Sequence, residues 1–219
     1  MKKYVIPSCI ADYDTLVIAN GEFPKSSSVL HHIRQAKYIT CCDGAMGECI
    51  KLQIHPDVII GDGDSLSAEL HRQYADKVVI IPEQDDNDLS KNVHYCIEHG
   101  HQKILIVAAT GKREDHTLGN ISLLMDYRQR ADVIMLTDYG LFIPTSGDCQ
   151  FVGEKGWQVS LFNFGSTHID ATGLVYPTRA FTNWWQGTLN EMQEDTFTIH
   201  ADGPYLVFIC FEKKHEGNK

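Results

Sequence analysis

Short aliphatic runs alternate with helical segments through the first two thirds of this chain of 219 residues. The run at residues 58–60, Val-Ile-Ile, is too short for a helix and is typical of a buried strand. Strands that alternate with helices at this spacing indicate βαβ units and a mostly parallel sheet. Further strands are predicted at 15–19, 38–42, 78–81, 103–109 and 132–136, and helices at 26–36, 67–75, 89–99 and 118–130.

The sequence changes in character after Gly140. Gly, Thr and aromatic residues become frequent, and no helical period is visible. Strands are predicted there at 157–162, 196–200 and 205–210. We therefore expect an α/β plus β protein. A mostly parallel α/β/α sandwich would occupy residues 1–144, and a small antiparallel β-sandwich domain would occupy residues 145–219.

Charge and cysteine content restrict the partners and the compartment. A formal net charge of −10 argues against a nucleic-acid backbone or an anionic membrane as the main partner. No apolar stretch is long enough for a membrane span, and the first residues lack the apolar region of a signal peptide. The seven Cys include no Cys-x-x-Cys pair, so we expect reduced thiols, a cytoplasmic location and no structural zinc.

Polar turns repeatedly follow the predicted strands, and ligands of open α/β sheets bind outside the carboxyl ends of strands. Asp62 and Asp64 come directly after the strand at 58–60, and a turn at Gly63 can bring both carboxylates to one point. Mg²⁺ is commonly held by carboxylates, although an acidic turn can also be merely solvated. Comparable polar turns begin after four other strands, at Asn20, Asp43, Glu83 and Thr110. This convergence favours a metal site.

Cations near the same edge are suited to phosphate. Asp88 and Lys91 share a face at the N-terminus of a predicted helix, where anions are favoured. Arg113 follows a Gly turn, and its guanidinium fork matches phosphate oxygens. Taken singly, Asp88 could be a helix cap and Lys91 a solvated residue. Arg113 and Asp115 could equally form a surface ion pair. Neither a P-loop nor a Gly-x-Gly-x-x-Gly fingerprint is present.

A set of motifs, taken in order, resembles the thiamine pyrophosphokinase family. In the α/β part the motifs are Cys-Asp-Gly-Ala at 42–45, Pro-Asp through Gly-Asp-Gly-Asp-Ser at 56–65, Gln84-x-x-x-Asp88-x-x-Lys91, and Thr-Gly-Lys-Arg-Glu-Asp-His-Thr-Leu-x-Asn at 110–120. Thr-Gly-Leu-Val-Tyr-Pro at 172–177 and Gly-Thr-Leu-Asn-Glu at 187–191 resemble the C-terminal β domain of that family. Each motif is weak alone, whereas the ordered set is specific.

The resemblance implies an ATP-dependent transferase of thiamine diphosphate biosynthesis. Such an enzyme moves a diphosphoryl group from ATP to the hydroxyl of thiamine and releases AMP. The resemblance also implies Mg²⁺ as cofactor and a homodimer. Its active sites would be shared between the α/β domain of one subunit and the β domain of the other. Neither nucleic acid nor membrane is expected as a partner.

Motif positions also suggest roles for individual residues. The resemblance implies catalytic roles for Asp62, Asp64, Asp88 and Arg113, and metal binding by Asp43, Asp62, Asp64 and Asp88. The resemblance implies contacts to ATP and its phosphates from Asp43, Gln84, Lys91, Arg113 and Asp115, and we expect one from Asn20 because it follows the first predicted strand. The resemblance implies contacts to thiamine from Tyr176 and Asn190, and we expect Trp185 to add an aromatic face. An aromatic face would suit the cationic thiazolium, although Trp184 or Trp185 could instead belong to the core or the dimer interface.

Four positions depart from the family pattern. Three of them leave the charged groups intact: Gly63 replaces the usual Phe, Asn87 the usual Thr, and Lys112 a common second Gly. Leu189 replaces the usual Ser before Asn190, which removes a hydroxyl from the thiamine side.

Two other classes of function remain open. One is a metal-dependent phosphohydrolase acting on a nucleotide, because acidic turns on an α/β sheet also serve that chemistry. The other is a non-catalytic nucleotide-binding regulator, which would need neither metal nor the full carboxylate set. The presence together of four charged residues argues against the regulator: Asp62, Asp64, Asp88 and Arg113.

Overall fold

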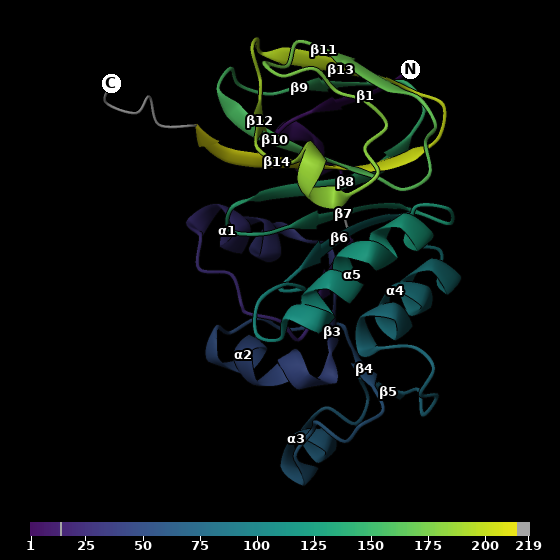
Figure 1. Ribbon diagram of the computed structural model, residues 1–219. Coiled ribbons are helices and arrows are strands. Elements are labelled where there is room, and N and C mark those ends of the chain that lie inside the picture. Colours follow the sequence, from purple (N-terminus) through teal and green to yellow (C-terminus); the bar gives the residue numbers. More distant parts are fainter. Residues whose placement is uncertain (14, 214–219) are drawn as a thin grey trace. The chain divides into compact units, whose positions relative to one another are not determined.

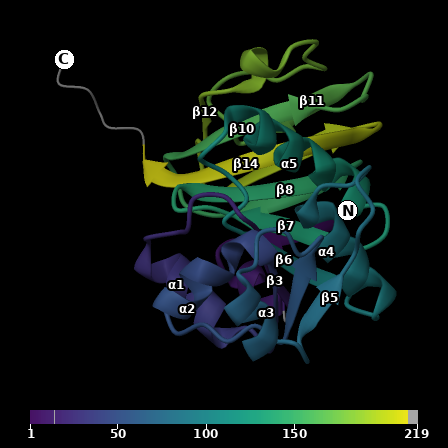
Figure 2. The ribbon, with the colours of Figure 1, turned by 90° about the horizontal axis from the view of Figure 1, so that it is seen from below.

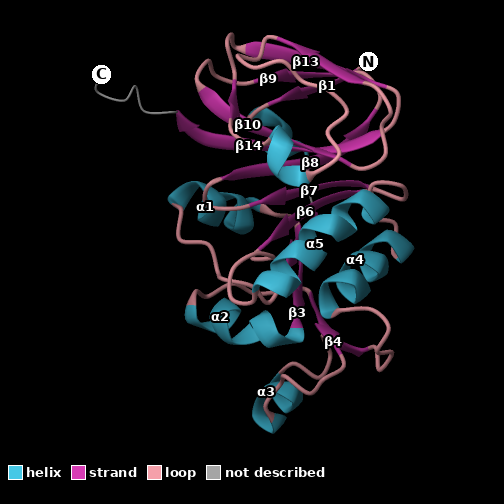
Figure 3. Ribbon diagram, in the orientation of Figure 1, coloured by secondary structure: helices cyan, strands magenta, loops and turns pink. Residues whose placement is uncertain are grey.

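The computed structural model describes residues 1–13 and 15–213, and the chain divides into two compact units. An α/β unit comprises Asp12–Asp138, and a β unit comprises Met1–Ala11 together with Tyr139–Lys219. Most of the helical residues belong to the first unit, whereas the second is built mainly of strands (Figure 3). Within the described part of the chain, no helix has both the length and the apolar character needed to cross a membrane.

The α/β unit contains a parallel sheet with the strand order β7-β6-β2-β3-β4-β5. Its strands are β2 (Thr15–Ile18), β3 (Tyr38–Cys42), β4 (Val58–Gly61), β5 (Val78–Ile80), β6 (Lys103–Val107) and β7 (Asp132–Leu136). Side chains on both faces of the inner strands are buried; Leu16, Ile59 and Ile106, for example, are almost inaccessible to solvent. Burial on both faces explains why these strands are continuous aliphatic runs.

Helices cover both faces of this sheet. They are α1 (Ser27–Gln35), α2 (Met46–Lys51), α3 (Ala68–Gln73), α4 (Asp88–Glu98) and α5 (Glu114–Tyr127). Helices α1 and α2 lie on one face, and α4 and α5 lie on the other (Figures 1 and 2). The chain leaves β2 towards β3, and later returns by way of α4 to β6 on the other side of β2. The order therefore reverses between β2 and β6, which is where ligands bind in open α/β sheets.

The β unit contains two groups of paired strands. One has the order β1-β9-β13-β11, formed by β1 (Lys2–Val5), β9 (Cys149–Val152), β13 (Thr196–Ala201) and β11 (Ile169–Thr172). The other has the order β12-β10-β14-β8, formed by β12 (Asn190–Glu191), β10 (Trp157–Asn163), β14 (Pro204–Lys213) and β8 (Gly140–Ser146). In the first group, the ring of Phe151 on β9 stacks against those of Tyr4 on β1 and Phe197 on β13, with centroid separations of 5.2 and 4.7 Å. Short 3-10 helices occur at Ser8–Asp12, Asp43–Ala45 and Trp184–Gly187.

The predicted α/β plus β class is confirmed, but five strands of the β unit were not predicted, and the domain boundary and one helix start differ from the sequence-based expectation: the unpredicted strands are β1, β8, β9, β11 and β12. Residues 1–11 and 139–144 belong to the β unit, because β1 pairs in parallel with β9 and β8 pairs with β14 from Gly140 onwards. Helix α5 begins at Glu114, four residues before the predicted start at 118. Its N-cap is Arg113, whose side chain makes no capping hydrogen bond, so the usual start signal is missing.

Candidate active site

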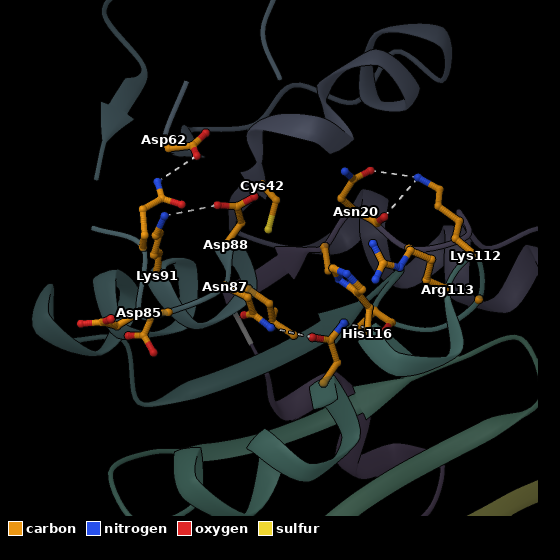
Figure 4. Close-up of a pocket in the computed structure, with 18 residues that line it drawn as sticks. Asn20, Cys42, Asp62, Asp85, Asn87, Asp88, Lys91, Lys112, Arg113 and His116 are labelled. Carbon is orange, nitrogen blue, oxygen red and sulfur yellow. Dashed lines mark hydrogen bonds and ion pairs between the residues drawn. The ribbon is translucent and has the colours of Figure 1, made fainter. Parts of the chain in front are cut away.

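A cavity of about 600 Å³ lies at the carboxyl edge of the parallel sheet, around the point where the strand order reverses (Figure 4). Cys42, the last residue of β3, and residues that follow β2, β4, β5 and β6 line it. Six of the residues expected to bind ATP, phosphate or metal lie in its wall: Asn20, Asp62, Gln84, Asp88, Lys91 and Arg113. The polar turns that are far apart in the sequence therefore do converge on one cavity.

A carboxylate cluster is formed by Asp43, Asp62 and Asp64. Each offers an oxygen within 4.8 Å of the others. Asp43 follows β3, is only 2% exposed, and accepts backbone hydrogen bonds from Gly44 (2.6 Å) and Gly63 (3.1 Å). There is no room for a larger residue at Gly61, since a Cβ there would lie 2.2 Å from Cγ of Asp43. The end of β4 is thus shaped around the Asp43 carboxylate.

Electrostatics makes this cluster suitable for a cation. Burial, and then the charge of Asp88, raises the pKa of Asp43. Burial also raises the pKa of Asp88, although Lys91 opposes the shift. The Asp64 backbone N–H and the Gln84 side chain, which donates at 3.2 Å, lower the pKa of Asp62. Crowded oxygen ligands short of positive charge fit a hard divalent ion such as Mg²⁺.

Asp88 stands apart from the three-carboxylate cluster. It opens α4, and its carboxylate lies 3.6 Å from Nζ of Lys91, which is 4% exposed. A buried ammonium needs such a partner. Among the described residues, the metal-suited group does not include Asp88. The four predicted ligands therefore divide into a group of three and one carboxylate that is paired with a lysine.

Two asparagines link the loops around the cavity. Asn87 is the N-cap of α4, and its Oδ1 accepts a hydrogen bond of 2.9 Å from the Ser90 backbone N–H. Its Nδ2 donates to Oδ1 of Asn120 on α5 at 3.1 Å. Asn120 in turn donates to the backbone oxygen of Ala109 at 2.8 Å. The position of Asp88, which follows Asn87 directly, is thereby tied to the end of β6.

The opposite wall of the cavity carries two cations and Asn20 (Figure 4). Arg113 donates two hydrogen bonds to the Asp115 carboxylate, at 3.1 and 2.5 Å, and both side chains are exposed. This pairing raises the pKa of Arg113 and lowers the pKa of Asp115. Asp115 does not line the cavity itself. Lys112 donates to both oxygens of Asn20.

The predicted thiamine residues belong to the β unit. Asn190 is buried; its amide donates to the Tyr176 backbone oxygen at 2.9 Å and its Oδ1 accepts from the Tyr176 N–H at 3.0 Å. The Asn190 side chain thus fixes the backbone that presents Tyr176, which is half exposed. Trp185 is 74% exposed, whereas Trp184 packs against Phe162 and Phe164.

Sequence reasoning did not assign site roles to several residues that line the cavity: Cys42, Asn87, Lys112, His116 and Asn120. All lie within or beside the motifs at 42–45, 84–91 and 110–120. The sequence feature that could have identified them is their position next to the charged residues of these motifs. Their common orientation towards the cavity depends on contacts between distant segments.

Comparisons with known proteins agree with this architecture. Residues 29–136 match the family model described as the catalytic domain of thiamin pyrophosphokinase, and residues 140–208 match that of its substrate-binding domain. A thiamin pyrophosphokinase of Caenorhabditis elegans is 31% identical over 129 residues, which is 54% of this chain and 53% of the relative. One from Oryza sativa is 25% identical over 229 residues, covering 89% and 86% of the two chains.

Solved structures share the fold. The thiamin pyrophosphokinase from Candida albicans superposes with a TM-score of 0.76 at 16% identity, covering 96% of this chain and 93% of that one. The Bacillus subtilis structure gives a TM-score of 0.72 at 19% identity, covering 90% and 97%. Fold and cavity thus place this protein in the class of α/β proteins that have an open parallel sheet with a cavity at its carboxyl edge. Within that class, the chain belongs to the thiamin pyrophosphokinase family.

Proposed function

We propose that this enzyme transfers a diphosphoryl group from ATP to the hydroxyl of thiamine, giving thiamine diphosphate and AMP. The observation that carries the proposal is that Asp62, a member of the three-carboxylate cluster, lines the same cavity as Lys91 and Arg113 at the reversal point of the sheet, whereas Asp43 and Asp64 stand next to Asp62 outside the lining. A nucleotide polyphosphate needs both a metal and cations. The family assignment then narrows the acceptor to thiamine.

Asp43, Asp62 and Asp64 would hold Mg²⁺, and Asp88 would complete the acidic side of the cavity. The ion would neutralise charge on the phosphate oxygens. Lys91 and Arg113 would bind phosphate oxygens and hold the reacting phosphorus in line with the attacking hydroxyl. Asp88, which lines the cavity outside the metal-suited group and whose pKa is raised by burial, would accept the hydroxyl proton. Asn20, Gln84 and Asp115 would orient the nucleotide or its cationic partners.

The β unit would bind thiamine and form the dimer. Exposed apolar side chains gather in the segment that carries the predicted thiamine residues: Val175, Tyr176, Trp185 and Leu189. An exposed group of this kind is typical of a binding surface. We propose that Tyr176 and Trp185 contact thiamine, that Asn190 holds the local backbone, and that a homodimer in the cytoplasm brings each β unit to the site of its partner.

Incubation with ATP, Mg²⁺ and thiamine tests the reaction. Formation of AMP and thiamine diphosphate in equal amounts is expected. Release of ADP or orthophosphate with thiamine unchanged would instead support the phosphohydrolase, and nucleotide binding without any turnover would support the regulator. Nothing in the family comparisons favours either alternative.

A further inference from the structure

Lys112 lines the cavity in an unusual backbone conformation. Its φ is +59°, in the left-handed region that side chains other than glycine rarely adopt. It lies in the turn between β6 and α5, directly after Gly111, whose φ is +78°. Glycine would adopt this conformation without strain. Strained residues of this kind cluster at functional sites, because the strain is retained only where something outweighs it.

The ammonium group of Lys112 is held at the cavity wall. Nζ donates hydrogen bonds to Oδ1 of Asn20 at 2.9 Å and to the Asn20 backbone oxygen at 3.1 Å. Asn20 is itself confined, since a Cβ at Gly44 would lie 2.1 Å from its Nδ2. In Figure 4, Lys112 and Asn20 lie across the cavity from Asp62 and Asp88. The fixed ammonium and the acidic side therefore face the same space from opposite walls.

The charge of Lys112 is not matched by the protein. The other cationic side chains of the cavity have carboxylate partners: Lys91 pairs with Asp88, and Arg113 pairs with Asp115. In the described ranges 1–13 and 15–213, no carboxylate lies within 4 Å of Nζ of Lys112. Two of its three N–H donors bind neutral oxygens of Asn20. One donor and a full positive charge remain for an anion.

We propose that Lys112 binds the phosphate chain of the nucleotide and raises the affinity of the site for nucleoside triphosphate. This inference rests on the proposed nucleotide site. Lys112 contributes binding rather than chemistry, because Asn20 holds its ammonium in place before the nucleotide arrives. Removal of the Lys112 charge therefore weakens nucleotide binding equally in the ground state and in the transition state.

Three substitutions separate charge from strain. Lys112→Met removes the charge and keeps a long side chain at positive φ. Lys112→Arg keeps the charge. Lys112→Gly removes both charge and strain. Binding of ATP and of adenosine is measured by calorimetry for each variant. Lys112→Met and Lys112→Gly are expected to bind ATP about tenfold more weakly, because each variant loses one hydrogen bond between two charged groups. Lys112→Arg keeps most of the affinity, and adenosine binding does not change.

Matched controls lie outside the cavity. Lys103→Met removes a lysine at the opposite end of β6, and Gln53→Gly relieves a comparable positive φ of 56°. Neither should change ATP binding, while Lys112→Gly and Gln53→Gly should both raise the thermal midpoint or leave it unchanged.

In turnover assays, Lys112→Met raises KM for ATP and leaves kcat and KM for thiamine unchanged.

Unchanged ATP affinity in folded Lys112→Met would overturn the proposal, as would an equal loss of adenosine and ATP binding. The outcome is separable from that of the proposed function. If the wild-type protein binds ATP without making thiamine diphosphate, the calorimetric difference between wild type and Lys112→Met still decides the role of Lys112.

Discussion

Asn87 and Asn120 join the N-terminus of α4 to α5 through a hydrogen bond of 3.1 Å between their side-chain amides. The same Asn120 amide binds the backbone oxygen of Ala109. Because Asp88 follows Asn87 directly, this link determines where that carboxylate meets the cavity. Asn87 stands where the family usually has Thr, and a Thr could cap α4 but could not reach Asn120 by an amide.

The asparagine link should contribute measurably to stability. Asn120→Ala leaves the Ala109 oxygen and the Asn87 amide without their partner, at an expected cost of about 1–3 kcal/mol in the free energy of unfolding. Asn87→Thr keeps a capping hydroxyl and should cost less, about 1 kcal/mol. Urea denaturation measures both. A negligible loss in both variants would mean that capping, which both retain, rather than the amide link is the stabilising contact.

Asp62→Asn should abolish turnover while the protein stays folded. Asp62 is partly exposed and its carboxylate binds Asp64 and Gln84, so an asparagine side chain fits the same space. We expect a loss of at least about a thousandfold, if the carboxylate holds the ion that neutralises the phosphates. Thermal unfolding should also show that added Mg²⁺ raises the midpoint of the wild type but not that of Asp62→Asn. Asp76→Asn, at an exposed position outside the cluster, is the control and should retain both properties.

Replacement of Gly63 should be costly although the family often carries a larger residue there. Its φ is +86°, and a Cβ would lie 2.7 Å from Cδ1 of Ile80. Gly63→Ala should therefore destabilise the fold by about 1–2 kcal/mol. Ile80→Val shortens the opposing side chain. Combined with Gly63→Ala, it should recover only that part of the lost stability that is due to the steric clash. Complete recovery in the double variant would show that the backbone conformation carries no strain.

The ionisation of Asp43 should make the metal-free protein less stable as the pH rises. Its folded-state pKa is raised above the ordinary value of 3.8, mainly by burial, so the folded state holds this proton more tightly than the unfolded state. Below pH 3.8 the carboxyl group is neutral in both states and carries no penalty. As the pH rises through the raised pKa, the folded state must bury a charge and loses stability relative to Asp43→Asn.

Thermal unfolding of wild type and Asp43→Asn across this pH range, without divalent ions, measures that difference. The midpoint of the wild type should fall relative to the variant above pH 3.8 and then level off. Mg²⁺ should reverse the trend for the wild type alone. A constant difference between the two proteins at all pH values would contradict the expected ionisation.

The sequence alone determined the elements that depend on local periodicity. The buried strands of the α/β unit are continuous aliphatic runs, and α4 has a clear apolar face, so their positions follow from short-range patterns. The sequence also placed the acidic turns at the carboxyl ends of strands. That placement was enough to predict an acidic site at one edge of a parallel sheet, because all parallel strands end at the same edge.

Only the tertiary structure decided which of these polar residues act together. It separated Asp88 from the group of Asp43, Asp62 and Asp64, and it assigned β1 to the β unit through pairing with β9. It also showed that Lys112 lies against Asn20, ninety-two positions away along the chain. Such contacts join segments distant in sequence, and their energies depend on burial, charge and backbone conformation in the folded chain, none of which a local pattern records.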